Sequence, residues 1–196
     1  MKKLLKDTRS LTILAVMLAI TIILDVTPLG AIPLGAVSAT IIHIPTIITG
    51  IILGPIAGFL MGTLMGLISL IHALTRPATP LDPLFINPLV SVLPRMFIGV
   101  VSYYTYAALK NFVNKEMLKE SVGAMIAGIA GSLTNTLLVF LMLYLLYAQE
   151  VAERIGVAFH ALFISVFTTN AIAEALVSAF ITMAIVVAYN KYKENK

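Results

Sequence analysis

The chain alternates between long apolar runs and short segments that carry charges or turn-forming residues. The longest run without a formal charge lies between Asp25 and Arg76, too long for one membrane helix of about 20 residues. Gly54-Pro55 divides this run, because proline is favoured in the first turn of a helix. Applied to the whole chain, the pattern predicts six helices, over residues 10–25, 40–53, 55–74, 88–111, 121–147 and 157–189.

Composition places these helices in a lipid bilayer. The 196 residues are 60% hydrophobic and only 11% charged, whereas soluble domains carry about a quarter charged residues. We therefore expect an all-α integral membrane protein, in which residues 1–196 form one domain, a six-transmembrane-helix bundle. The net charge of +4 is too small and too dispersed to indicate a nucleic-acid partner.

An even number of spans puts both termini on the same side of the membrane. Lysine and arginine are enriched in cytoplasmic segments, so their distribution decides which side that is. Ten of the thirteen cations lie at the termini or in the loop between the fourth and fifth helices: Lys2, Lys3, Lys6, Arg9, Lys110, Lys115, Lys119, Lys191, Lys193 and Lys196. Both termini are therefore predicted to be cytoplasmic.

Two long loops, residues 26–39 and 75–88, lie on the predicted outer side and are rich in proline or glycine. Four prolines restrict the backbone of the second loop, which indicates a shaped lid rather than a loose tether. Loops held by a rigid scaffold commonly carry binding function. The outer side is therefore the expected binding side.

A few polar side chains interrupt the apolar helices. A lone arginine at the bilayer centre costs about 2.5–3.5 kcal/mol on insertion scales, so Arg95 should face a partner or water. Asn135 lies near the middle of the fifth helix, while Asn170 and Glu174 are four residues apart on one face of the sixth. Nearly all of them fall in the predicted outer half, as do the three histidines, His43, His72 and His160.

This distribution has two interpretations. In the first, the polar side chains line an outward-facing pocket roofed by the two loops. In the second, Arg95 and Glu174 form an ion pair and the asparagines join helices, with no ligand involved. We favour the pocket. A channel is disfavoured because the inner halves of the helices are almost purely apolar.

The sequence lacks the motifs of several common activities. The sequence has no P-loop, no His-Glu-x-x-His and no Gly-x-Ser-x-Gly. The three histidines sit on separate segments without ligand spacing, and there is no cysteine, so we expect no metal and no cofactor. Glu174 is the only acid well inside a helix, which leaves an intramembrane enzyme as an alternative with little support.

Small residues recur at four-residue spacing. Gly54, Gly58, Gly62 and Gly66 form a stripe on the third helix, which favours close packing inside the bundle over a partner interface. Ala15 and Ala19 in the first helix are ambiguous in the same way. The two halves of the chain do not repeat each other, so alternating access by one chain is disfavoured and partners should supply the energy.

The chain resembles the S components of energy-coupling factor (ECF) vitamin transporters over essentially its whole length. The resemblance is carried by His43-Ile44-Pro45, by Leu53-Gly54-Pro55-Ile56-Ala57-Gly58, and by Pro94-Arg95-Met96-Phe97-Ile98-Gly99. Leu133-Thr134-Asn135-Thr136 and Asn170-Ala171-Ile172-Ala173-Glu174-Ala175 extend it. Together they look most like the pantothenate-type members.

The resemblance implies a six-helix protein of the prokaryotic plasma membrane that captures a vitamin from outside. It implies that this protein joins a transmembrane T component and two cytoplasmic ABC ATPases, then topples to release the vitamin inside. Ala15 and Ala19 match the family's Ala-x-x-x-Ala contact with the T component. Members that handle cobalt or nickel begin with Met-His, whereas this chain begins Met1-Lys2.

For pantothenate, the resemblance and the chemistry suggest roles for six residues. Arg95 is expected to clamp the carboxylate, and Asn135 and Asn170 to read the amide or the hydroxyls. Glu174 is expected to accept from a hydroxyl or to orient Arg95. His72 and Asn87 are expected at the mouth.

Glu174 also leaves other substrates possible. A carboxylate beside an anionic ligand must be paired or protonated, so its presence is less easily explained for pantothenate. Hydroxymethylpyrimidine or a pyridoxine-like vitamin is the first alternative, followed by riboflavin. A membrane subunit with a purely structural role is the remaining one.

Overall fold

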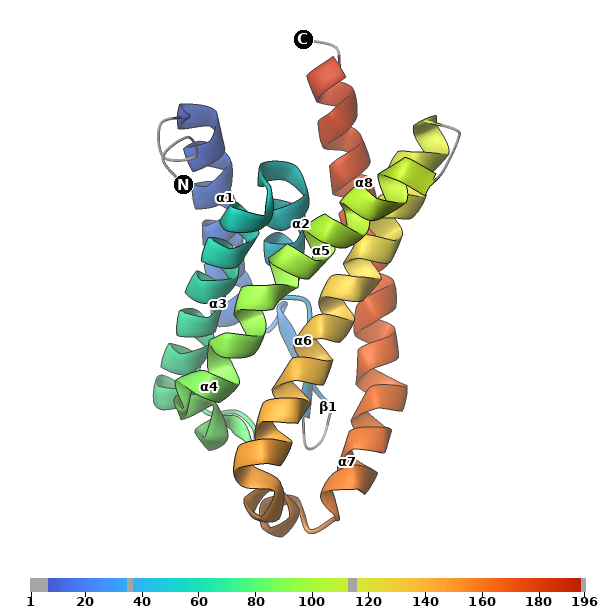
Figure 1. Ribbon diagram of the computed structural model, residues 1–196. Coiled ribbons are helices and arrows are strands. Elements are labelled where there is room, and N and C mark those ends of the chain that lie inside the picture. Colours follow the sequence, from blue (N-terminus) through green and yellow to red (C-terminus); the bar gives the residue numbers. More distant parts are fainter. Residues whose placement is uncertain (1–6, 35–36, 113–115, 195–196) are drawn as a thin grey trace.

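The structure, a computed structural model, describes residues 7–34, 37–112 and 116–194, with the backbone alone described for 31–34, 37–39, 111, 112 and 116–119. Lys2, Lys3, Lys6, Lys115 and Lys196, which entered the cation count, lie outside the described residues, and the side chain of Lys119 is not described. The chain is largely helical. Its longest helices run side by side as a bundle, with a small β-hairpin set among them (Figure 1).

The elements follow one another in a simple order. Before the bend at Arg76 come α1 (Thr8–Val26), strands β1 (Ala31–Leu34) and β2 (Val37–Thr40), α2 (Ile44–Leu53) and α3 (Pro55–Thr75). The second half holds a 3₁₀ turn η2 (Asp82–Ile86), α4 (Pro88–Ser91), α5 (Leu93–Phe112), α6 (Glu116–Ile155), α7 (Phe159–Val166), a π-helical segment η3 (Phe167–Ala171) and α8 (Ile172–Glu194).

The helices differ from the predicted ones where the backbone departs from regular geometry. The helix predicted from residue 40 begins at Ile44, because residues 31–34 and 37–40 form an antiparallel hairpin that pairs Ala31 with Thr40. The helix predicted over 88–111 is divided at Val92, two residues before Pro94. The helix predicted to end at 147 continues to Ile155 through a kink at Tyr147 (φ −140°, ψ 23°).

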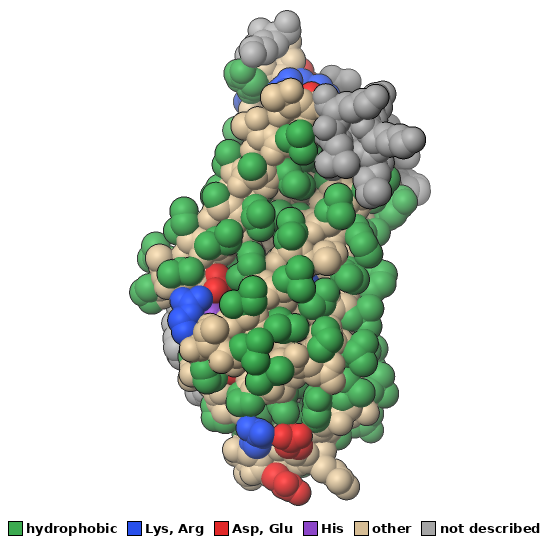
Figure 2. All heavy atoms as spheres, turned by 90° about the vertical axis from the view of Figure 1, so that its left-hand side faces the viewer, with side chains coloured by type: hydrophobic (Ala, Val, Ile, Leu, Met, Phe, Trp, Pro, Cys, Tyr) green, Lys and Arg blue, Asp and Glu red, His purple; other side chains and the backbone are tan. Residues whose placement is uncertain are grey.

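The bundle presents an apolar exterior suited to lipid. Among the described residues, four stretches are long and apolar enough to cross a membrane, Thr8–Val26, Pro55–Thr75, Glu120–Ile155 and Phe159–Glu194. α2 is apolar but has only 10 residues, and α5 carries Arg95 and Lys110. Figure 2 shows hydrophobic side chains over most of one face of the molecule.

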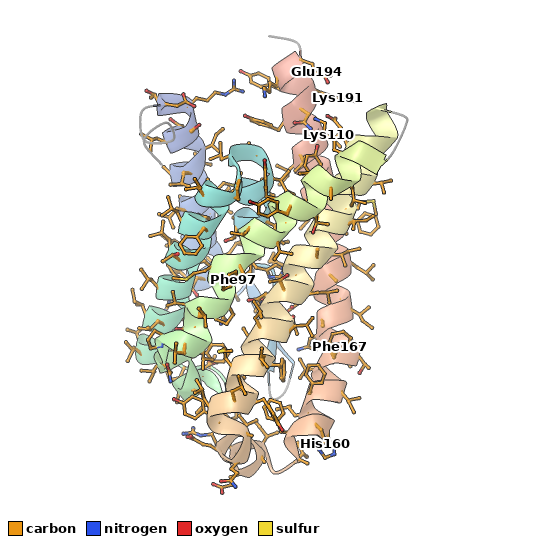
Figure 3. The ribbon with its side chains drawn as sticks, in the orientation of Figure 1. Phe97, Lys110, His160, Phe167, Lys191 and Glu194 are labelled. Atoms are coloured by element: carbon orange, nitrogen blue, oxygen red, sulfur yellow. The ribbon has the colours of Figure 1, made fainter. Side chains whose placement is uncertain are left out.

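The start of α1 and the end of α8 lie at the same end of the bundle (Figure 1). Lys110, Lys191 and Glu194 lie at that end, and His160 lies at the opposite one (Figure 3). The cavity described below is lined by the last residues of α1 and α3, so it lies in the half of the bundle away from the described chain ends.

Glycines let α3 and α5 touch backbone to backbone. A Cβ atom on Gly58 would lie 2.8 Å from the carbonyl carbon of Gly99, and one on Gly99 would lie 2.5 Å from the Cα of Gly58. Gly62 abuts the backbone of Arg95 in the same way. The stripe on α3 therefore packs inside the bundle, except at Gly54, whose positive φ of 98° turns the chain between α2 and α3.

The half of the bundle nearer the termini is less apolar inside than the sequence suggested. Ser178 and Thr182 continue the face of Glu174 along α8, and both are fully buried. His43 is also fully buried, and its Nε2 lies 2.8 Å from the Ser178 hydroxyl. Polar side chains thus extend from the cavity into the packed core.

α1 is the helix least integrated into the bundle. Thr21 is its one buried residue, and the helix as a whole contacts α2 and α3. Ala15 and Ala19 are exposed on its outer face. A helix with so much uncovered apolar surface must meet lipid or another protein.

Candidate functional site

A cavity of about 410 Å³ lies between α1, α3, α5, α6 and α8. This volume suits a small-molecule ligand of vitamin size. The residues predicted to bind substrate all line it except Asn87. Its polar lining includes Asp25, Thr40, His72, Arg76, Arg95, Asn135, Thr136, Asn170 and Glu174, and its apolar lining includes Phe85, Val139, Phe140 and Val166.

Arg95 supplies a buried positive charge to this cavity. Its side chain is 7% exposed, and its Nη1 donates a hydrogen bond to the carbonyl oxygen of Val90. The Phe85 ring stacks beside the guanidinium, with the ring centroid 5.1 Å from Cζ. Nε is buried without a hydrogen-bond partner. The guanidinium is thus held in place, with its Nε–H left unpaired.

Glu174 supplies the buried acid, and its partner is a hydrogen-bond donor. One carboxylate oxygen accepts the backbone N–H of Thr40 at the end of β2. Thr136 also lines the cavity, and its hydroxyl donates to the Ser132 carbonyl at 3.4 Å. Among the described residues there is no ion pair between Glu174 and Arg95. The ion pairs described join Asp25 to His72 and Arg76, and Glu150 to Arg154. The interpretation of the polar residues as an internal Arg95–Glu174 pair is therefore not supported.

Two asparagine side chains present unused polar atoms beside the cavity. The Oδ1 of Asn135 and the Nδ2 of Asn170 are buried and have no hydrogen-bond partner. Asn170 lies in the π-helical segment, and its Oδ1 accepts the Thr169 hydroxyl at 2.9 Å. Single π-helical turns are frequent at functional sites because they shift side chains out of register. Two residues of the cavity lining therefore carry an unpaired acceptor and an unpaired donor.

The ends of α1 and α3 are tied together at the edge of the cavity. Asp25 accepts from His72 Nδ1 and from Arg76 Nη2, each at 3.0 Å, and its side chain is 7% exposed. His72, which was expected at the mouth, lines the cavity as the partner of Asp25. Both contacts join residues about fifty positions apart, so no local pattern in the sequence indicated them.

Asn87, also expected at the mouth, does not line the cavity. Its Oδ1 accepts the Leu89 N–H at 3.0 Å, and its Nδ2 donates to the Tyr147 hydroxyl at 3.0 Å. It is the N-cap of α4, followed by Pro88 in the first helical position. The Asn-Pro pair is a helix-start signal that could have assigned this role.

The three histidines lie apart, with His43 bonded to Ser178, His72 to Asp25, and His160 at the far end of the bundle (Figure 3). In the part of the chain that the structure describes, no three His, Cys, Asp or Glu side chains gather as a metal site would require.

Comparison with known proteins identifies the family. Residues 9–186 match the family described as ECF transporter, substrate-specific component. The chain belongs to this family. As an ECF S component it is a transporter subunit and not an enzyme, and its apolar helices are those of a membrane protein.

One relative of this S component carries a substrate in its name. The pantothenic acid transporter PanT of Lactococcus lactis subsp. cremoris (strain MG1363) is 28% identical over 173 residues, an alignment that covers 81% of each chain.

Sequence reasoning missed several residues of the site in this S component. Asp25 and Thr40 were overlooked because their contacts are made across the fold. Phe85 was overlooked because a phenylalanine in a loop carries no signal of its own. Arg95 and Glu174, by contrast, are charged residues within apolar helices, and this pattern predicted a polar pocket.

Proposed function

We propose that this S component binds pantothenate from the outer side of a prokaryotic plasma membrane. The observation that carries the proposal is Arg95, a buried guanidinium in a ligand-sized cavity, with no acidic side chain paired to it among the described residues. A buried charge is costly unless it is paired, so the site is complementary to an anionic group. The name of the lactococcal relative supports the same substrate.

The rest of the cavity suits the remainder of pantothenate. The molecule carries an amide, two hydroxyls and a gem-dimethyl group besides its carboxylate. The free Oδ1 of Asn135 can accept from an N–H or a hydroxyl, and the free Nδ2 of Asn170 can donate to a carbonyl. Val139, Phe140 and Val166 provide apolar wall for the methyl groups.

The contacts of Glu174 argue against the alternative vitamins as substrates. A pyrimidine or pyridine ligand would use a free carboxylate to accept its N–H or hydroxyl groups. This carboxylate already accepts the backbone N–H of Thr40. We therefore propose that Glu174 holds the protein's own backbone in position and that Arg95 binds the ligand.

The proposal extends to topology and partners. The helices form six spans if α2 and α5 also cross the bilayer, with both termini cytoplasmic as the cation distribution predicts. The exposed Ala15 and Ala19 face of α1 would contact a T component, which would couple the subunit to two ABC ATPases. His72 would then border the entrance from the outer side.

Equilibrium binding to the purified protein in detergent tests the substrate. Pantothenate should bind, and excess hydroxymethylpyrimidine, pyridoxine or riboflavin should fail to displace it. Displacement by one of these vitamins at a lower concentration than unlabelled pantothenate would contradict the assignment. Uptake of pantothenate into cells that express the chain with a T component and ATPases would test the wider proposal.

A further inference from the structure

The position of Arg95 depends on a feature of the backbone just before it. In a continuous helix, the carbonyl of Val90 would accept the N–H of residue 94. Residue 94 is a proline and has no N–H, so the helix is interrupted between α4 and α5. Val90 is fully buried, so its carbonyl oxygen cannot turn to water and needs another donor.

Arg95 is that donor. Its Nη1 donates to the Val90 carbonyl, which folds the side chain back along its own helix. The carbonyl is itself held firmly, because the N–H groups of Val90 and Ser91 donate to the Asn87 carbonyl at 2.9 and 3.1 Å. The N-cap contact of Asn87 secures the same turn. The cap, the proline and the arginine therefore form one local unit.

Phe85 holds the guanidinium from a second direction. Its ring lies 5.1 Å from Cζ and comes from the 3₁₀ turn η2. That turn is itself braced by Asp82, which accepts the N–H of Thr79 at 2.8 Å and its hydroxyl at 2.6 Å. A guanidinium stacked on a ring and bonded to a carbonyl has little rotational freedom left.

We propose that Pro94 and Phe85 are positioning residues that fix Arg95 for an anionic ligand before the ligand arrives. Pro94 acts by leaving the Val90 carbonyl free for the arginine, and Phe85 acts by stacking on the guanidinium. Because arginine otherwise loses considerable side-chain entropy on binding, fixing it beforehand favours affinity for an anion. This inference rests on the proposed anion site and names the residues that set its selectivity.

Selectivity for the carboxylate is the first test. Pantothenate and panthenol, in which a hydroxymethyl group replaces the carboxylate, are titrated against wild type, Pro94→Ala and Pro55→Ala. Alanine at 94 restores an N–H that competes for Val90, so the preference for pantothenate should fall about tenfold. Pro55 begins α3 and is the matched control, for which the preference should be unchanged. An unchanged preference in Pro94→Ala would overturn the proposal.

A double-mutant cycle separates positioning from general damage. Pro94→Ala should have no further effect on pantothenate affinity in an Arg95→Ala background, because the arginine it positions is gone. Additive losses would contradict the proposed role. Phe85→Leu should lower the same preference about threefold, whereas Phe85→Tyr, which keeps the ring, should retain it.

The ligand-free protein gives a readout that does not depend on the vitamin. The chain has four arginines, so ¹⁵N-arginine labelling gives a simple spectrum in which Arg95→Lys identifies the Arg95 signal. Rotation of the guanidinium and exchange of its N–H protons should be slow in wild type and about tenfold faster in Pro94→Ala. Equal rates would refute the positioning. If the rates differ but wild type binds no pantothenate, the proposed function fails and the positioning stands.

Discussion

The cavity has two charged walls, and they are built differently. On the α5 wall, the Arg95 guanidinium bonds to a carbonyl of its own chain segment and keeps its Nε–H without a partner. On the α8 wall, the Glu174 carboxylate accepts the backbone N–H of Thr40 in β2. Two buried side chains of opposite charge thus line one cavity and attract each other, but they do not form an ion pair within 4 Å. The first keeps an unpaired N–H, and the second joins α8 to β2.

Arg95→Ala should have the largest effect on binding. Loss of a buried charged partner typically costs about 2–5 kcal/mol, so pantothenate affinity should fall at least about thirtyfold. Isothermal titration of the detergent-purified variant measures this. Arg154→Ala is a matched control, because Arg154 is paired with Glu150 on the exposed end of α6 and does not line the cavity. Equal losses in the two variants would point to general electrostatics instead of a contact at Arg95.

Gly62→Ala should disturb the arginine wall through its backbone. The added Cβ would collide with the Arg95 carbonyl, and overpacking of this kind costs about 1–3 kcal/mol. We expect a lower thermal midpoint together with weaker pantothenate binding. On the other wall, a Cβ on Gly128 would meet the Ser178 carbonyl oxygen at 2.7 Å, so Gly128→Ala should lower stability with a smaller effect on affinity. A larger loss of affinity in Gly128→Ala would reverse our assignment of the two walls.

Substitutions of Glu174 test whether its charge or its hydrogen bond to Thr40 matters for binding. Glutamine keeps an oxygen that can accept the Thr40 N–H, whereas alanine leaves this N–H without its partner. Glu174→Ala should therefore weaken pantothenate binding about tenfold, and Glu174→Gln by clearly less. Titration of both variants decides the point. If Glu174→Gln weakened pantothenate binding as much as Glu174→Ala, binding would depend on the negative charge of Glu174. That result would favour a direct contact between Glu174 and the ligand.

The asparagines should give the smallest effects. Asn135→Ala and Asn170→Ala each remove one neutral hydrogen bond to the ligand, worth about 1 kcal/mol or about fivefold in affinity. Their effects should be smaller still for a ligand that lacks the amide group. No change for either variant would remove the asparagines from the site.

The sequence predicted the membrane class and most of the cavity, because lipid makes polar residues conspicuous. Arg95, Asn135, Asn170 and Glu174 stood out in apolar segments, and the structure brings all four to one cavity. Periodicity could not predict the hairpin at 31–40 or the π-helical segment, since neither follows a regular helical repeat. The sequence also could not predict which groups these four polar side chains contact. Thr40 is 134 residues from Glu174, and only the folded chain shows which polar group meets which.

The most direct test of the account is a binding cycle with two proteins and two ligands. Pantothenate and the neutral panthenol are each titrated into wild type and Arg95→Ala under the same conditions. We expect wild type to prefer pantothenate by at least about thirtyfold and the variant to bind both ligands with similar, weak affinity. A preference for pantothenate that survives in Arg95→Ala would show that another residue binds the carboxylate, and it would contradict the proposed role of Arg95.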